Sequence, residues 1–437
     1  MKPRPPLPPG PYLVVGLARS GIAAARMLGA HGEVTGCDFA EPQEASSLEG
    51  VEVRLRSDGL DLLGRTRTVV KSPGVPREAP VIVAARERGL EVVGELELAW
   101  RLLPNEFIAV TGTNGKTTTV ELLGAIYRAA GRPVEVAGNV GTPLASLVGK
   151  IDPEATVVCE ASSFQLEDSS ELAPECAVLL NVTEDHIDRH GTFEDYLAAK
   201  LRIFQNQDED DVAVLPSGFA GQHGRARTLR FGGPDADLAE RDGELWWEGA
   251  RMMDAGELRL RGRHNLENAM AGSAAALARG IDVEPLREAL RTFAGVPHRL
   301  EEVAERDGVL FVNDSKATNV ASALVGIEAF DGGVHLIAGG SLKGGGFSGL
   351  REAVMARCRA CYLIGEAAQQ LEADLAGTVA LERCGDLEHA VEAAATAAQP
   401  GEVVLLSPAC ASYDQFRNFE ERGDRFRALA SEIAAAG

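Results

Sequence analysis

Residues 107–117 have the sequence FIAVTGTNGKT, an apolar stretch that runs into a glycine-rich loop. The stretch Phe107–Val110 predicts a buried strand, and a helical pattern follows the loop. A glycine loop between a strand and a helix suits phosphate, because the loop amides and the helix N-terminus face the anion. Lys116 would reach the terminal phosphates of a nucleotide, and Thr117 would bind Mg²⁺. Although Val110 stands where the strict P-loop pattern has its first glycine, the loop predicts an ATP-consuming enzyme.

Short apolar stretches alternate with helical patterns through most of the chain, which predicts an α/β fold with largely parallel sheets. The alternation is interrupted at Arg101–Asn105 and again at Thr292–Pro297. We therefore predict three domains, over residues 1–104, 105–298 and 299–437. The other predicted strands are Tyr12–Val15, Val34–Cys37, Thr156–Cys159, Ala177–Leu180, Val309–Val312, Val334–Ile337, Cys361–Ile364 and Val403–Leu406.

Charge and composition exclude several classes of partner. The 437 residues carry a net charge of −22, so the chain repels nucleic acid and anionic membrane surfaces. No apolar stretch reaches the roughly 20 residues of a membrane-spanning helix, and the proline-rich start lacks the apolar core of a signal peptide. The odd number of scattered cysteines favours a reduced, cytoplasmic protein, in which Cys358 and Cys361 are expected to be buried structural thiols.

A second glycine loop lies near the N-terminus. Gly16–Gly21 follows the predicted strand Tyr12–Val15, and Asp38 ends the next strand, 22 residues after Gly16. This arrangement resembles the dinucleotide fingerprint, in which glycines allow a tight turn at the phosphates and an acid binds a ribose. Ala18 replaces the middle glycine, which disfavours a nicotinamide cofactor. We predict a Rossmann-like domain that holds another nucleotide diphosphate.

Acids and histidines are dense in Asn181–His190, directly after another predicted strand. The segment suits Mg²⁺ or a substrate and equally suits a solvated turn, so both interpretations stay open. In the helix that follows, Lys200 either extends its amine to solvent or is desolvated, with a lowered pKa. In the second case CO₂ could convert the amine to a carbamate able to bind a metal. The apolar face that Lys200 shares is predicted from Phe193, Leu197, Leu201 and Phe204.

Further polar side chains stand at strand ends, where α/β folds bind ligands. Glu160 suits Mg²⁺, and the hydroxyls and amide of the next residues, 161–165, suit a substrate. Asn313–Asn319 and Ser407–Ser412 each follow a predicted strand, and Lys343 lies in a glycine-rich loop.

Together these segments resemble the Mur ligases, and among them the branch that uses D-glutamate. The resemblance covers nearly the whole chain. Its general motifs are Gly112–Thr117, Asn181–His186 and Gly262–Asn265 with Asn268; those of the D-glutamate branch are Glu160–Glu167, Asn313–Asn319 and Ser407–Phe419.

The resemblance implies a Rossmann-like N-terminal domain for a UDP-linked substrate, a central P-loop-type ATPase domain and a Rossmann-like C-terminal domain for the amino acid. It implies an ATP-dependent amide ligase that adds D-glutamate to UDP-N-acetylmuramoyl-L-alanine through an acyl phosphate. Such a ligase serves peptidoglycan precursor synthesis in the cytoplasm, and hence cell-wall biogenesis, cell shape and cell division. The resemblance also implies a monomer, two Mg²⁺ ions and a carbamylated Lys200.

The resemblance assigns roles to particular residues of this chain. Lys116, His186 and Lys200 would be catalytic, and Thr117, Glu160, His186 and Lys200 would bind the metals. ATP would contact Gly112, Thr113, Asn114, Gly115, Lys116, Thr117, Thr118, Asn268, Arg299, Asp314 and Lys316. The UDP-linked substrate would contact Gly16, Arg19, Ser20, Asp38, Ser72, Pro73, Gly74, Asn139, Ser162 and Gln165. D-Glutamate would contact Thr318, Lys343, Ser412 and Phe419.

Three other functions compete with this interpretation. Another amide ligase of the same superfamily is disfavoured by Ser407–Ser412 and by the UDP-type first segment. A regulatory P-loop protein would not need the acid/histidine cluster together with Lys200 and Lys343. A nicotinamide-dependent oxidoreductase is disfavoured by Ala18 and has no use for the phosphate loop.

Overall fold

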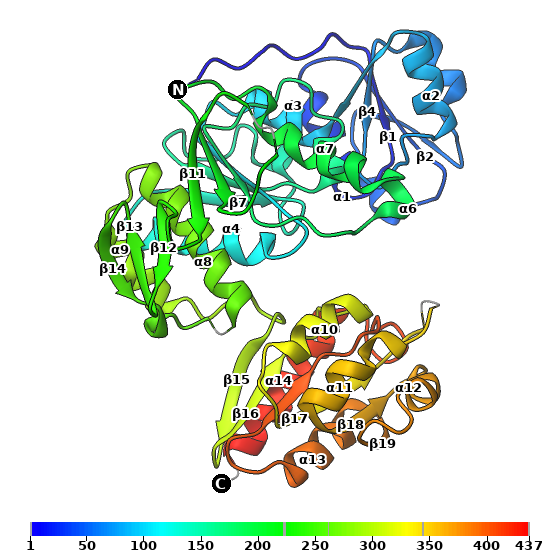
Figure 1. The fold of residues 1–437 in the computed structure, drawn as a ribbon. Helices are drawn as coiled ribbons and strands as arrows, with labels where there is room; N and C mark the ends of the chain where they lie inside the picture. Colours follow the sequence, from blue (N-terminus) through cyan, green and yellow to red (C-terminus); the bar gives the residue numbers. More distant parts are fainter. Residues whose placement is uncertain (1, 222–223, 261, 343–344, 436–437) are drawn as a thin grey trace. The chain divides into compact units, whose positions relative to one another are not determined.

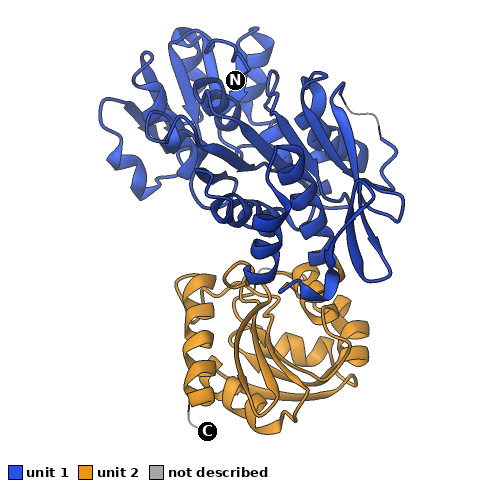
Figure 2. Ribbon diagram, turned by 90° about the vertical axis from the view of Figure 1, so that its left-hand side faces the viewer, with its two compact units in different colours: residues 1–259, 264–293 blue, residues 260–263, 294–437 orange. Residues whose placement is uncertain are grey.

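The computed structural model describes residues 2–221, 224–260, 262–342 and 345–435. In these residues the strands form three separate sheets (Figure 1). The chain divides into two compact units, coloured separately in Figure 2. Residues 1–259 with 264–293 make up unit 1, and residues 260–263 with 294–437 make up unit 2. Among the described residues, no helix is both long and apolar enough to cross a membrane.

The first sheet of unit 1 is entirely parallel, with strand order β3-β2-β1-β4-β5. The order reverses between β1 and β4, and the crevice at such a reversal is where doubly wound sheets bind ligands. The strands are β1 (Tyr12–Val15), β2 (Val34–Asp38), β3 (Glu52–Leu55), β4 (Thr68–Lys71) and β5 (Glu91–Gly94). The helices are α1 (Arg19–Leu28), η1 (Gln43–Ser47), η2 (Leu60–Arg65), α2 (Pro80–Glu87) and α3 (Glu95–Leu102).

The second sheet of unit 1 has the order β14-β13-β12-β11-β10-β9-β6-β8-β7 among the described residues. Its strand β6, which leads into the phosphate loop, lies between β8 and β9. The strands are β6 (Phe107–Thr111), β7 (Val134–Gly138), β8 (Thr156–Glu160), β9 (Cys176–Leu179), β10 (Val212–Pro216), β11 (Arg227–Gly232), β12 (Leu238–Arg241), β13 (Glu244–Trp247) and β14 (Ala250–Asp254). The helices are α4 (Lys116–Ala129), η3 (Leu144–Leu147), α5 (Ser163–Leu166), α6 (Ile187–His190), α7 (Phe193–Gln205), η4 (Ala255–Glu257), α8 (Arg263–Ala278) and α9 (Val283–Thr292).

Unit 2 contains the third sheet, with the order β15-β16-β20-β17-β18-β19. Of its strands in the described residues, only β15 runs antiparallel to its neighbour, so the carboxyl ends of β16, β20 and β17 lie next to one another. The strands are β15 (Glu301–Arg306), β16 (Val309–Asn313), β17 (Val334–Gly339), β18 (Cys358–Ile364), β19 (Ala380–Gly385) and β20 (Val403–Leu406). The helices are α10 (Val320–Glu328), η5 (Ser348–Leu350), α11 (Arg351–Arg357), α12 (Ala368–Asp374), α13 (Leu387–Ala397) and α14 (Phe419–Ala435).

The two sheets of unit 1 are joined by apolar and ionic contacts. One continuous core runs from Val14 on β1 to Ala109 on β6. The fully buried Lys71, at the end of β4, pairs with the buried Asp168, with 2.6 Å between Nζ and Oδ2. Burial raises the pKa of this aspartate, and the field of Lys71 opposes that shift. The first glycine loop and the phosphate loop therefore belong to one packed body.

Every predicted strand is present, within three residues at each end. Cys358 and Cys361 are buried free thiols on β18, as expected. The predicted face of the Lys200 helix is largely wrong, because Phe193, Leu197 and Leu201 are only half-buried and Phe204 alone of the four is buried. Burial on α7 falls instead on Tyr196, Ala199, Lys200, Ile203 and Phe204.

Candidate active site

The phosphate loop turns sharply into α4. Gly115 has φ +84, a backbone conformation that side chains disfavour, and a Cβ at this position would lie 2.1 Å from Oδ1 of Asn268. Asn268 lies on α8, far along the chain, and its amide group also contacts Asn265 at 3.4 Å. Glycine at this position therefore lets the amide of Asn268 approach the backbone of the loop.

Thr117 and Glu160 meet at the base of the loop. The Thr117 hydroxyl donates to Oε2 of Glu160 at 2.8 Å, and the Asn139 amide donates to Oε1 at 2.9 Å. Glu160 is 2% exposed, so both carboxylate oxygens are fixed by neutral donors in a buried position. The Lys116 amine folds back onto the carbonyls of Gly112 and Thr113, at 2.9 Å from each.

Lys200 reaches the same loop from α7. Its Nζ donates to the Gly112 carbonyl at 2.7 Å and lies 4.4 Å from the centre of the Tyr196 ring. Burial, together with the nearby positive charge of Lys116, lowers the pKa of the Lys200 amine to about 7. The side chain is buried rather than extended to solvent. The amine therefore has a substantial uncharged fraction at neutral pH.

The acid/histidine segment is tied to the phosphate loop by Asn181. Its side chain accepts from the Asn114 amide at 2.9 Å and donates to the Asn114 carbonyl at 3.1 Å. His186 has φ +52 at the start of α6, and its ring lies 4.8 Å from Phe164 and 6.4 Å from Tyr196. His186 and Lys200 thus both lie beside the Tyr196 ring.

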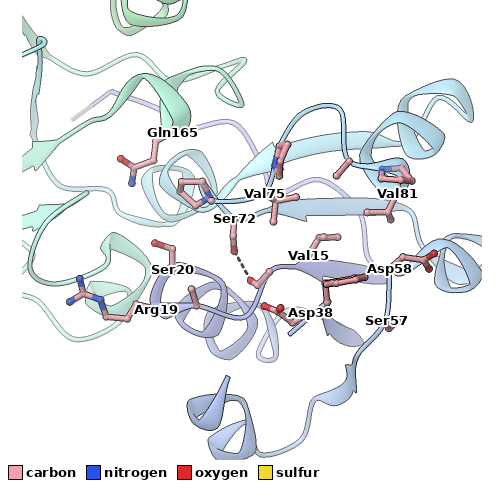
Figure 3. A pocket seen from close by; sticks show the side chains of 18 of the residues that line it. Val15, Arg19, Ser20, Asp38, Ser57, Asp58, Ser72, Val75, Val81 and Gln165 are labelled. Atoms are coloured by element: carbon pink, nitrogen blue, oxygen red, sulfur yellow. Dashed lines mark hydrogen bonds between the residues drawn. The ribbon is translucent and has the colours of Figure 1, made fainter. Parts of the chain in front are cut away.

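A cavity of about 640 Å³ lies at the carboxyl ends of β1 and β4, where the strand order reverses (Figure 3). Its walls come from the strands of the first sheet and the segments that connect them, from Asn139 directly after β7, and from Gln165 on α5. Of the residues assigned to the UDP-linked substrate, those that line it are Gly16, Arg19, Ser20, Asp38, Ser72, Pro73, Gly74, Asn139 and Gln165.

The cavity wall is shaped by the glycine loop. A Cβ on Gly21 would lie 1.8 Å from the Gly16 carbonyl oxygen, so α1 begins directly against the loop. The Ser72 hydroxyl donates to that carbonyl at 2.6 Å, the contact drawn in Figure 3. Asp38 accepts from the Leu17 amide at 2.6 Å, so the acid predicted to bind a ribose also fixes the loop.

Ser162 is the one assigned UDP-substrate residue that does not line this cavity. It caps α5 instead, with its hydroxyl accepting from the Gln165 amide at 3.3 Å and the Gln165 side chain bonded in return to the Ser162 amide. This capping box fixes the short helix that follows Glu160.

In unit 2, the assigned residues gather at the carboxyl ends of β16 and β20. Asp314 is buried and accepts from the Ser407 hydroxyl at 2.8 Å; burial raises the pKa of Asp314 to about 7, and the field of Arg299 opposes this. The Lys316 amine lies 4.9 Å from the centre of the Phe419 ring. Thr318 is half-buried and Ser412 is buried. Lys343 lies outside the described residues.

The groups predicted to hold metal fit Mg²⁺ in unit 1. Thr117 and Glu160 offer a hydroxyl and a carboxylate, the hard oxygen donors that Mg²⁺ prefers, at the start of a phosphate loop. Among the described residues, no three or more histidine, cysteine, aspartate or glutamate side chains are grouped so that they could bind a metal ion by themselves. A second ion beside His186 would therefore need a further ligand, such as phosphate oxygens or a carbamate on Lys200.

Several residues that contact the phosphate loop or the cavity wall, or that line the cavity, are absent from the sequence-based assignment. Tyr196, one helical turn before Lys200, contacts the Thr113 hydroxyl at 3.0 Å. Arg189 donates to the Val75 carbonyl at 2.7 Å and so ties the acid/histidine segment to the cavity wall. Phe39 is 85% exposed and lines the cavity beside Asp38. The spacing of four residues between Tyr196 and Lys200 is a signal that was available in the sequence.

Comparison with protein families agrees with this geometry. The Mur ligase middle domain matches residues 110–276, and the Mur ligase glutamate ligase domain matches residues 298–410. The chain belongs to the Mur ligase family. It is 43% identical to the UDP-N-acetylmuramoylalanine--D-glutamate ligase of Acidobacterium capsulatum, over 97% of each chain. It is 45% identical to the ligase of the same name from Anaeromyxobacter dehalogenans, over 96% of this chain and 97% of that one.

Solved Mur ligases share the fold at much lower identity. The UDP-N-acetylmuramate-alanine ligase of Thermotoga maritima aligns with a TM-score of 0.60 and 18% identity, over 97% of this chain and 99% of that one. The MurF ligase of Thermotoga maritima, solved in complex with ADP, aligns with a TM-score of 0.58 and 20% identity, over 92% of this chain and 89% of that one. The mixed α/β architecture with several parallel-rich sheets is therefore that of Mur ligases.

Proposed function

We propose that the chain is an ATP-dependent ligase that joins D-glutamate to UDP-N-acetylmuramoyl-L-alanine in cytoplasmic peptidoglycan precursor synthesis. Relatives that carry this name match at 40–45% identity along nearly their whole length. The observation that carries the proposal is the chain of contacts from Asn139, which lines the cavity, through Glu160 to Thr117 of the phosphate loop. This path joins a nucleotide-sized cavity to a phosphate-binding loop.

The cavity would hold the UDP moiety. Arg19 and the amides at the start of α1 suit the diphosphate, and Asp38 suits a hydroxyl-bearing group. In Figure 3, Arg19, Ser20 and Gln165 lie on the left of the view, and Asp38, Ser57 and Asp58 lie on the right. With the diphosphate at Arg19 and Ser20, the sugar and its acyl chain would extend toward Asn139 and Gln165. The carboxylate to be activated would then lie near the phosphate loop.

The reaction has two steps. A carboxylate oxygen of the substrate attacks the γ-phosphorus of ATP, the bond to the β–γ bridging oxygen breaks, and an acyl phosphate and ADP form. The uncharged amine of D-glutamate then attacks the acyl carbon, loses a proton, and phosphate leaves with the former carboxylate oxygen. Lys116 would neutralise charge on the transferred phosphoryl group, and Gly112–Thr118 with Asn268 would position the nucleotide.

Two Mg²⁺ ions, when bound, supply electrostatic stabilisation of the phosphoryl oxygens. Thr117 and Glu160 would hold one of them, and His186 with a carbamate on Lys200 would hold the other. The lowered pKa of the buried Lys200 amine supports the carbamate, because only the uncharged amine reacts with CO₂. The amine adds to the carbon of CO₂ and loses a proton, which leaves an anionic carbamate.

Unit 2 would supply the amino-acid site. Thr318, Ser412, Phe419 and Lys343 would bind D-glutamate, and Arg299, Asp314 and Lys316 would complete the ATP site. The three sheets would accordingly serve three domains: Rossmann-like for the UDP-linked substrate, P-loop-type for ATP and Rossmann-like for the amino acid. The boundaries at 104 and 298 and a monomeric state remain part of this proposal.

The direct test measures phosphate release from ATP by the purified protein with UDP-N-acetylmuramoyl-L-alanine. We expect release with D-glutamate and little with L-glutamate, L-alanine or diaminopimelate. Reactions that lack the UDP-linked substrate control for background hydrolysis of ATP. Release with none of these amino acids would refute the proposal, and release with L-alanine or diaminopimelate alone would assign the chain to another branch of the family.

A further inference from the structure

Arg422, in the first turn of α14, is one of the largest fully buried side chains, with 1% of its surface exposed. Removing a guanidinium from water is costly unless nearly all of its donors find acceptors. The complete burial of Arg422 therefore indicates that its hydrogen bonds contribute to the structure around it.

The guanidinium bridges three segments of the chain. Nε donates to the Ser315 hydroxyl at 3.0 Å, and Nη2 donates to the carbonyls of Ser315 at 2.8 Å and Cys410 at 3.1 Å. Nη1 donates to the carbonyls of Ala411 at 3.2 Å and Gly339 at 3.5 Å. These acceptors follow or end β16, β20 and β17, three neighbouring strands of the third sheet. One side chain thus connects three adjacent strand ends.

The backbone that Arg422 contacts contains an unfavourable conformation and a close approach of two chain segments. Ala409 has φ +56, and a Cβ on Gly340 would lie 2.1 Å from the Ala411 carbonyl oxygen. The left-handed backbone at Ala409 is strained and persists where the surroundings impose it, and the close approach at Gly340 leaves no room for a side chain. The same serine that receives Arg422 donates its hydroxyl to the Phe419 carbonyl at 2.8 Å, which adds the start of α14 to the network.

The cation is held by dipoles. In the described part of the chain, Arg422 forms no ion pair, and it donates to four carbonyls and one hydroxyl. Burial lowers the pKa of the guanidinium to about 10, while the charges of Cys410 and Asp414 oppose this, so Arg422 remains protonated at neutral pH. Because the carbonyl oxygens point toward the charged guanidinium of Arg422, this attraction fixes the orientation of the loops to which the carbonyls belong.

We propose that Arg422 is a positioning residue for the amino-acid substrate: it fixes the loops that carry Thr318, Ser412 and Phe419. The inference rests on the proposed function, which assigns those three residues to D-glutamate. A role in folding alone is disfavoured by the other anchors of α14. Phe426 and Ala430 bury this helix in an apolar core, and Arg427 pairs with Glu301 at 2.9 Å.

The test compares Arg422→Met and Arg422→Lys with Arg425→Met, a control on the same helix whose half-exposed side chain pairs with Glu388. Steady-state kinetics give KM for D-glutamate, and calorimetric titration gives the Kd of UDP-N-acetylmuramoyl-L-alanine. For Arg422→Met we expect KM for D-glutamate to rise at least about tenfold, with the Kd of the UDP-linked substrate unchanged. Arg422→Lys keeps the positive charge but lacks the planar set of N–H donors of the guanidinium, and it should raise KM for D-glutamate about threefold.

An unchanged KM for D-glutamate in folded Arg422→Met would overturn the inference, as would an equal loss of affinity for the UDP-linked substrate. If Arg422→Met does not fold, Ser315→Ala decides, because it removes one acceptor with little change in volume. It should raise KM for D-glutamate about threefold, and an unchanged value would again overturn the inference. Absence of D-glutamate-dependent turnover in the unsubstituted protein would instead refute the proposed function.

Discussion

At the carboxyl ends of β6, β7 and β8 in the second sheet, here called the central edge, the side chains with predicted chemical roles contact one another. At the carboxyl ends of β16, β17 and β20 in the third sheet, here called the third edge, the buried Arg422 bonds to the strand ends and the loops that follow them. Thr117, Glu160 and Asn139 form a direct hydrogen-bonded chain, and Lys200 reaches the same loop. In unit 2, by contrast, Arg422 is bonded mainly to backbone carbonyls. We therefore infer that the central edge serves chemistry on phosphate and that the third edge holds the amino acid in place, as the proposed function requires.

This difference predicts that substitutions at the central edge lower kcat, while those at the third edge raise KM for the amino acid. The largest expected effect is that of Lys116→Met. Loss of the cation beside the transferred phosphoryl group should lower kcat by about 10³-fold. ADP formation measures this, with the exposed Lys150→Met as the control. A loss below tenfold in the folded variant would remove Lys116 from the chemistry.

Glu160→Gln keeps the size of a side chain whose oxygens contact Thr117 and Asn139, but removes its charge. We expect a loss on the order of 100-fold in kcat/KM and a higher Mg²⁺ concentration for half-maximal rate. A Mg²⁺ titration measures both, with the exposed Glu154→Gln as the control. Equal Mg²⁺ dependence in variant and parent would contradict a metal-binding role.

Lys200→Ala should lose between about 10- and 100-fold in activity, with partial recovery when a short-chain carboxylate replaces the carbamate. Because the pKa of Lys200 is lowered to about 7, its uncharged fraction, and hence carbamate formation, should rise as pH increases through 7. Carbon-13 NMR of the protein in labelled bicarbonate detects the carbamate directly. Full activity in Lys200→Ala, or no labelled signal above pH 7, would exclude the modification.

The same lysine links stability to pH in the unmodified chain. The unfolded amine keeps its ordinary pKa of 10.5, so between pH 7 and 10.5 the unfolded state binds more protons than the folded state. The free energy of unfolding should therefore rise with pH across this window more steeply in the parent than in Lys200→Met. Urea titrations in CO₂-free buffer at several pH values measure the difference. Identical slopes would mean that the amine is not desolvated.

The smallest expected effect belongs to Thr318→Val, which removes one hydroxyl at the third edge and keeps the shape of the side chain. KM for D-glutamate should rise about fivefold while kcat stays near that of the parent. The exposed Thr396→Val on α13 serves as the control. A fall in kcat without a change in KM would contradict the expectation that the third edge contributes to amino-acid binding rather than to the chemical step.

The parallel strands that the sequence predicts are local apolar stretches, but other parallel strands were not predicted, namely β3, β4, β5, β7, β10, β11 and β19. The antiparallel ribbon β12–β14 was not predicted, although Asp242-Gly243 and Glu248-Gly249 mark its two turns with positive φ values. The face of α7 was misassigned, because contacts with distant segments decide which side of the helix is buried: Tyr196 contacts Thr113 of the phosphate loop, and α7 packs against α5.

The candidate site divides in the same way. Gly112–Thr117 is a local motif whose spacing carries its chemistry. Neither the contact of Asn139 with Glu160 nor the cavity beside it follows from spacing, because the pairing of β7 with β8 creates the contact and residues of both sheets of unit 1 line the cavity. Arg422 contacts a serine 107 positions away, and nothing in the sequence of α14 distinguishes it from Arg425 and Arg427 on the same helix. Contacts between residues that are far apart in the sequence can be recognised only once the fold is known.

The central claim is that ATP activates a carboxylate of the UDP-linked substrate. The most direct measurement uses UDP-N-acetylmuramoyl-L-alanine with oxygen-18 in its alanyl carboxylate and follows the label by mass spectrometry of the released phosphate. We predict one labelled oxygen in each phosphate formed with D-glutamate, because the leaving phosphate retains the former carboxylate oxygen. Product formation with unlabelled phosphate would contradict the account.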